Sequence, residues 1–168
     1  PKRIMASDEA RAFLREITIP SRSYAATLAR LNGWKLNGTM GRPLVRIHRA
    51  IHVTGGGVWG QFGEVLPEGV GADLTTMPRP PRALLLAQQY AREQGIPFPD
   101  YAGYDTFHGG CGMLVVCDLR EVDTVIDEAK RDGHKAQLVG RTTSSSKGGV
   151  RILSHFADGG YLSSLRPL

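Results

Sequence analysis

Apolar residues that recur every three to four positions predict several helices along this chain. Phe13 and Leu14 belong to one such face, and Val125 and Ala129 belong to another. Residues that accept hydrogen bonds from free backbone N–H groups precede three of these segments, and the expected N-caps are Ser7, Ser21 and Asp118. The expected helices cover residues 8–15, 22–31, 58–66, 82–93 and the segment from Asp118 to Gly133.

Shorter apolar runs between these helices predict strands. The run over residues 112–117 is apolar throughout, so it is expected to be a central strand. The other expected strands are 45–53, 72–74, 135–141 and 150–153. Polar loops are expected at 33–44 and 142–149, and residues 154–168 have no period and are expected to be a loose tail. Alternation of the two element types without repeats predicts one α/β domain with a mixed sheet over residues 1–168.

Length and composition agree with a soluble globular domain. The chain has 168 residues, of which 41% are hydrophobic and 22% are charged. No apolar run approaches the roughly 20 residues of a membrane-spanning helix, and residues 1–4 carry charge without an apolar run behind them, so no leader is expected. Cys111 and Cys117 fit neither a disulfide framework nor a paired metal site, so a cytoplasmic protein is expected.

Positive charge is concentrated in the first part of the chain. Residues 1–50 contain ten Lys and Arg against three Asp and Glu, whereas residues 51–168 contain eleven against thirteen. This asymmetry indicates either an anionic partner or a solvated basic face. Nucleic acid is not the expected partner, because the basic part has only Phe13, Tyr24 and Trp34 as aromatic residues and no interleaved stacking pattern.

The segment Thr54-Gly55-Gly56-Gly57, between an expected strand and an expected helix, is the strongest local candidate for a binding site. Consecutive glycines let backbone N–H groups converge on an anion, and the start of a helix adds partial positive charge. Thr54 adds a hydroxyl group. A plain flexible turn is the alternative. The segment lacks the spacing and the lysine of a P-loop, and it is not a dinucleotide fingerprint.

Two further segments carry candidate chemistry. Glycines at 109, 110 and 112 predict close backbone approach, and the neighbouring His108 is suited to proton transfer or hydrogen bonding. The alternative is that His108 is a structural histidine in a loop. Cys111 has no activating neighbour other than His108. Earlier in the chain, Ser21 and Arg22 are expected to face an anion at a helix start, or to be a simple cap and a surface arginine. The histidines and carboxylates show no metal-ligand spacing.

In this order, the three segments resemble the C-terminal domain of the aminoimidazole ribonucleotide synthetase family, the phosphoribosylformylglycinamidine cyclo-ligases. The resemblance covers about residues 13–153, and the matching segments are Pro20–Tyr24, His52–Gly57, Leu66–Gly69, Tyr104–Met113 and Gly148–Arg151. The sequence departs from the family at three places. Ser21 stands where the family usually has Thr, Ile51 replaces a small residue, and His108 replaces Asn.

The resemblance implies a three-layer α/β/α domain that forms one wall of a substrate cleft. Such enzymes use ATP to phosphorylate a formyl oxygen of formylglycinamidine ribonucleotide, close the imidazole ring and release phosphate. ATP and Mg²⁺ are expected to bind mainly to an N-terminal domain whose motifs this chain lacks. That domain and a phosphorylated substrate are therefore the expected partners, with no nucleic acid and no membrane.

Residue roles follow from the same resemblance. His52 and His108 are the expected catalytic residues. The residues expected to bind substrate or phosphate are Ser21, Arg22, Thr54, Gly55, Gly56, Gly57, Gly109 and Gly110. No metal ligand is expected in this chain, which alone is expected to be inactive and mainly monomeric. The alternative function is a catalytically incomplete module of the same superfamily that binds a ligand or a partner.

Overall fold

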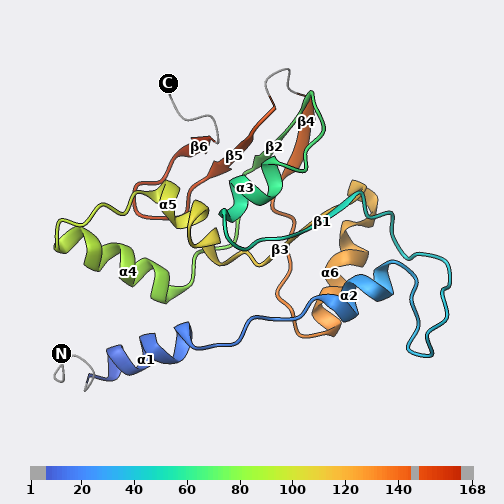
Figure 1. Ribbon diagram of the computed structural model, residues 1–168, viewed down its shortest axis with the longest axis horizontal. Coiled ribbons are helices and arrows are strands. Elements are labelled where there is room, and N and C mark those ends of the chain that lie inside the picture. Colours follow the sequence, from blue (N-terminus) through green and yellow to red (C-terminus); the bar gives the residue numbers. More distant parts are fainter. Residues whose placement is uncertain (1–6, 145–147, 164–168) are drawn as a thin grey trace.

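The computed structural model describes residues 7–144 and 148–163 and contains a mixed four-stranded sheet, which lies at the top of Figure 1. Its strand order is β4-β2-β5-β6. β2 (Val70–Leu74) and β5 (Val150–Leu153) are parallel, whereas β4 (Arg141–Ser144) and β6 (Tyr161–Ser163) run antiparallel to their neighbours. The mixed α/β class that the sequence predicts is confirmed.

A separate two-stranded ribbon is formed by β1 (Arg49–His52) and β3 (Met113–Val116), which are antiparallel. The strands are therefore divided between two sheets rather than joined in one. The expectation that 112–117 is a central strand is wrong, because β3 pairs only with β1 among the described residues. Leu114 is the one buried residue of β3, and the other three residues of the strand are partly exposed.

The hydrophobic core lies between the four-stranded sheet and two short helices, α3 (Gly57–Gly63) and α5 (Asp100–Asp105). Trp59 of α3 stacks on Tyr101 with ring centroids 4.6 Å apart. Its indole N–H donates to the carbonyl of Val150 at 3.1 Å, so the buried ring is tied to β5. The inward residues of the sheet are Ala72, Leu74, Val150 and Ile152.

Two other helices pack against each other beside the ribbon. These are α2 (Ala25–Leu31) and α6 (Val122–Arg131), which follows a 3₁₀ turn at Leu119–Glu121. Arg30 of α2 donates to Glu128 at 2.8 Å and to Asp132 at 2.7 Å. One guanidinium group thereby joins the two helices at their edge.

The remaining helices are α4 (Arg82–Glu93) and α1 (Asp8–Ile17), which lie next to each other at the left of Figure 1. The backbone N–H of Ala10 donates to the Ser7 side chain at 3.1 Å, so the expected N-cap of α1 is confirmed. The prolines before residue 82 lead into α4 as predicted, and α4 has the predicted bounds. None of the helices within residues 7–144 and 148–163 is long and apolar enough to cross a bilayer.

A hairpin projects between α2 and β1. Trp34 and Met40 form a β-bridge, and the N–H of Lys35 donates to the carbonyl of Thr39 at 2.9 Å. Leu36 at its tip is fully exposed, with a relative accessibility of 108%. This hairpin, residues 34–40, is a distinct feature within the predicted loop 33–44.

The segment after β5 is held by a buried carboxylate, so the expectation of a loose tail is wrong for residues 154–163. Asp100 is only 2% exposed and accepts hydrogen bonds from Ser154 Oγ at 2.7 Å and Gln88 Nε2 at 2.8 Å. The backbone N–H groups of Asp158 and Gly159 also donate to it. Residues 164–168 lie outside the described residues.

Four other sequence expectations are corrected by the structure. The expected strand 135–141 is irregular up to residue 140, and β4 instead occupies part of the predicted loop 142–149. The second helix begins at Ala25 rather than Arg22, with Tyr24 as its N-cap residue. Ser21 is therefore not a helix cap, and Ser21 and Arg22 lie in an extended connector. Asp118 precedes the 3₁₀ turn and forms no side-chain cap.

Candidate functional site

The glycine turn that links β1 to α3 contains three residues with different surroundings. Gly56 and Gly57 have positive φ angles of 88° and 58°, which favour glycine. A Cβ atom on Gly57 would lie 2.1 Å from the carbonyl oxygens of Tyr104 and Asp105, so this glycine is required for α3 to pack on α5. A Cβ atom on Gly55 would meet no atom within 4 Å. Gly57 is thus a packing residue, whereas Gly55 borders open space.

The backbone donors of this turn are partly free. The N–H of Gly57 donates to the carbonyl of Thr54 at 3.0 Å and closes the turn. The N–H groups of Gly55 and Gly56 form no hydrogen bond with any described residue. Gln61 Nε2 donates to the carbonyl of Gly55 at 2.8 Å and fixes its orientation. Two exposed donors therefore precede α3, which has only seven residues.

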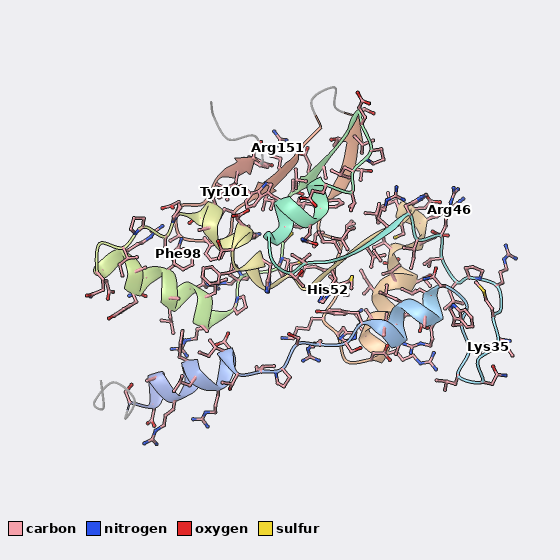
Figure 2. All side chains as sticks on the ribbon, viewed as in Figure 1. Lys35, Arg46, His52, Phe98, Tyr101 and Arg151 are labelled. Atoms are coloured by element: carbon pink, nitrogen blue, oxygen red, sulfur yellow. The ribbon has the colours of Figure 1, made fainter. Side chains whose placement is uncertain are left out.

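His52 and His108 lie at the same end of the β1–β3 ribbon, because His52 pairs with Met113, five residues after His108. His52 is exposed at the end of β1 (Figure 2), and His108 occupies a 3₁₀ turn just before β3 with a φ angle of 48°. Burial lowers the pKa of His108, and the nearby His52 lowers that pKa further. His108 Nδ1 is buried without a hydrogen-bond partner among the described residues. At neutral pH His108 is therefore an uncharged imidazole next to an exposed one.

Gly109 and Gly110 allow close approach, but the groups that approach them belong to the protein. A Cβ atom on Gly109 would lie 2.6 Å from the Tyr104 ring, and one on Gly110 would lie 2.5 Å from Pro81. The expectation of close backbone approach is confirmed for both glycines. Their predicted contact with substrate stays a prediction.

Tyr24 was not among the residues predicted to form the site, yet it lies beside His52. Its ring centroid is 6.1 Å from that of His52 and 5.0 Å from that of His134. A Cβ atom on Gly112 would lie 2.2 Å from the Tyr24 hydroxyl oxygen, so glycine at 112 makes room for the phenol. His134 follows α6 in the loop after Gly133, and no local sequence motif marks it.

The two cysteines and the possible metal ligands are the remaining candidate groups. Burial raises the pKa of Cys111 to about 11, so its thiol is protonated at neutral pH and is a poor nucleophile. Both cysteines are free. Within residues 7–144 and 148–163, no group of three His, Cys, Asp or Glu residues is arranged to hold a metal ion.

Several curated proteins are similar to this chain over its central part. It is 31% identical over 108 residues to a phosphoribosylformylglycinamidine cyclo-ligase of Magnetococcus marinus, covering 64% of this chain and 29% of that protein. A protein of the same name from Synechococcus sp. is 31% identical over 109 residues, covering 64% and 30%. A third, from Alkaliphilus metalliredigens, is 32% identical over 104 residues, covering 61% and 28%.

The chain thus aligns with only 28–30% of the length of these relatives. Residues 39–153 match the family described as AIR synthase related protein, C-terminal domain. This match covers more than half of the 168 residues. The chain therefore belongs to the family of AIR synthase related proteins, as their C-terminal domain.

Proposed function

We propose that this chain is the substrate-cleft domain of an ATP-dependent cyclo-ligase that converts formylglycinamidine ribonucleotide to aminoimidazole ribonucleotide in the cytoplasm. The observation that carries the proposal is that three segments meet at one end of the β1–β3 ribbon. His52 ends β1 opposite Met113 of β3, His108 lies five residues before Met113, and the glycine turn begins two residues after His52. The relatives with 31–32% identity are cyclo-ligases by name. Their much greater length supports a second domain as the partner.

ATP and Mg²⁺ belong to that partner in this proposal. Mg²⁺ prefers carboxylate and water oxygens in octahedral geometry, and the described residues of this chain offer no cluster of acidic ligands. When bound, the nucleotide supplies the phosphate that activates the formyl oxygen. In this proposal the partner domain supplies the ligands of the metal ion.

The residues of this chain position the substrate and move protons. The free N–H groups of Gly55 and Gly56, with the Thr54 hydroxyl, hold phosphate oxygens. Ring closure requires loss of a proton from the attacking nitrogen. His108 is neutral at pH 7 because burial lowers its pKa, so it is suited to accept that proton. His52 is exposed and serves as the hydrogen-bonding residue on the open side.

The test is complementation with the missing half of the enzyme. The chain is mixed with the N-terminal portion of the Magnetococcus marinus cyclo-ligase, and ATP-dependent formation of aminoimidazole ribonucleotide is measured. We expect no turnover by the chain alone, turnover with the partner, and a loss of about 100-fold or more for His108→Ala. His155→Gln, which alters an exposed histidine outside the site, is the matched control. Turnover by the chain alone, or full activity of His108→Ala, would contradict the proposal.

The alternative is a module that binds a phosphorylated ligand or a partner without catalysis. The exposed hairpin 34–40 favours it, because Trp34, Leu36 and Met40 are all accessible next to basic residues. This alternative would be supported if the chain bound a phosphorylated ligand but gave no turnover when mixed with the ATP-binding portions of several cyclo-ligases.

A further inference from the structure

Three aromatic side chains from separate parts of the chain meet at one end of the β1–β3 ribbon. Tyr24 comes from the connector before α2, His52 from the end of β1, and His134 from the loop after α6. The Tyr24 ring lies 5.0 Å from the His134 ring and 6.1 Å from the His52 ring, tilted to both. The two imidazoles therefore flank one phenol.

A guanidinium group lies at the same place. Arg22 Nη1 donates to the carbonyl of Gly133 at 3.4 Å, directly before His134. Its positive charge also lowers the pKa of Tyr24, against the larger effect of burial, which raises that pKa. Arg22 is exposed, and its one hydrogen bond among the described residues leaves most of its five N–H donors available.

Polar atoms in this group lack partners. His134 Nδ1 is buried without a hydrogen bond to any described residue. The Tyr24 hydroxyl group likewise forms none with the described residues, although it lies against the backbone of Gly112. Buried polar atoms are normally paired, so the unpaired His134 Nδ1, beside a phenol that donates to no described residue, indicates that this place accepts a ligand.

A carboxylate that interacts with His134, that of Asp132, is already paired. Asp132 accepts hydrogen bonds from Arg30 at 2.7 Å and from the Thr27 hydroxyl. It holds α2 against α6 and faces that contact. Apart from the hydrogen bond from Arg22 to the Gly133 carbonyl, the side chains of Arg22, Tyr24, His52 and His134 donate to no described residue.

We propose that Arg22, Tyr24, His52 and His134 form a binding subsite for the phosphate group of a sugar phosphate or nucleotide. A guanidinium group, a phenol and two imidazoles supply donors from several directions, which suits a tetrahedral anion with three terminal oxygens better than a planar carboxylate. Tyr24 and His134 are the new members. The inference deepens the proposed function, because it assigns the substrate's phosphate to residues beyond the glycine turn.

Calorimetric titration of the full chain with inorganic phosphate, ribose 5-phosphate, magnesium-free ATP and acetate tests the subsite. We expect phosphate-bearing ligands to bind and acetate not to bind. The tighter of ribose 5-phosphate and ATP identifies the source of the phosphate. NMR signals of the His134 and His52 imidazoles should shift on saturation with the tighter ligand. Unmoved His134 signals, or binding of acetate as tight as that of phosphate, would overturn the subsite.

Matched variants separate the subsite from general damage to the fold. We expect His134→Ala to weaken binding about tenfold, Tyr24→Phe to weaken it several-fold, and His134→Gln to restore part of the loss. His155→Gln should bind as the unaltered chain does. Equal affinity of folded His134→Ala and the unaltered chain would refute the assignment. These measurements need no partner domain. The binding result can therefore contradict the subsite while the complemented enzyme still turns over. Equally, complementation can fail while the chain alone still binds phosphate.

Discussion

At the scale of single residues, adjacent glycines in one turn serve different purposes. Gly57 is buried against α5, while Gly55 is exposed with no neighbour for an added Cβ atom. Gly56 has a φ angle of 88°, so a side chain there would strain the backbone whatever the space. The position that best tests ligand binding is therefore Gly55, because its substitution leaves the turn intact.

We expect Gly57→Ala to lower the free energy of unfolding by more than about 3 kcal/mol, since it adds a clash with α5 to an unfavourable φ angle. Gly55→Ala should change that free energy by less than about 0.5 kcal/mol. Urea unfolding of the two variants measures both effects. Similar losses from the two substitutions would show that the turn does not pack as described.

His108 occupies a backbone conformation that suits asparagine better. With φ at 48°, His108→Asn is expected to raise the free energy of unfolding at pH 7 by about 0.5–1 kcal/mol. His155→Asn, at an exposed position, is the control. A destabilised His108→Asn variant would mean that histidine contacts outweigh the backbone strain.

The lowered pKa of His108 predicts how the free energy of unfolding changes with pH. Its pKa in the folded chain lies below the ordinary value of 6.5, chiefly because of burial. The unfolded chain then binds more protons, so this contribution to stability is complete above about pH 6.5 and declines as the pH falls toward the folded pKa. His108→Asn should flatten the loss of stability between about pH 6.5 and 5. An unchanged pH profile would contradict the burial of this imidazole.

At the scale of elements, Asp100 of α5 holds the segment that leads to β6. Burial raises its pKa, but hydrogen bonds from Ser154, Gln88 and the backbone of residues 158 and 159 outweigh that effect, and the net pKa is lowered. Because the pKa of Asp100 is lower in the folded chain than in the unfolded one, Asp100 stabilises the fold above about pH 3.8. This stabilisation is lost as the pH falls through the folded pKa.

Asp100→Ala is expected to cost about 3 kcal/mol, since it leaves several donors unpaired in the interior. Asp158→Asn is the matched control, because the Asp158 side chain is 56% exposed and pairs with Arg92 at the surface. We expect that control to cost less than about 1 kcal/mol. Hydrogen exchange across residues 154–163 should rise in Asp100→Ala and stay unchanged in Asp158→Asn.

The predictability of each element follows its local signals. α4 was predicted with its observed bounds, because prolines precede it and Gly95 follows it. β3 was misplaced at the centre of a sheet, since an apolar run does not reveal how many neighbours a strand has. β6 was missed because its order depends on Asp100, far away in the sequence, and on pairing with β5.

The residues of the candidate site also differ in whether a local sequence pattern predicts them. His52, His108 and the glycine turn were predicted from short motifs, and all three lie at the same end of the β1–β3 ribbon, while their roles stay predictions. Ser21 was misassigned as a cap because a helix was expected directly after it, whereas α2 begins four residues later, at Ala25. Tyr24 and His134 meet only through tertiary packing of α2 on α6, which no local pattern reports.

At the scale of the whole molecule, the hairpin 34–40 is the most exposed apolar feature. Leu36 and Met40 have relative accessibilities of 108% and 63%, next to Lys35, which Figure 2 shows far from His52. Paired substitution Leu36→Thr and Met40→Thr should leave the Tm unchanged, because neither residue is buried.

We expect the chain to be mainly monomeric with weak association, and the paired substitution to reduce that association in light scattering. Val65→Thr, at an exposed residue away from the hairpin, is the control. A tight dimer at micromolar concentration, or association that the hairpin substitutions do not change, would count against this role.

The parallel pairing of β2 with β5 has a consequence for synthesis of the chain. Leu74 and Ile152 are neighbours in the sheet, yet α4, α5, β3, α6 and β4 all lie between them in the sequence. A nascent chain on the ribosome therefore leaves one hydrogen-bonding edge of β2 unpaired until almost the entire segment has been translated. The core closes late, and during translation the chain is a natural client for chaperones that shield unpaired strands.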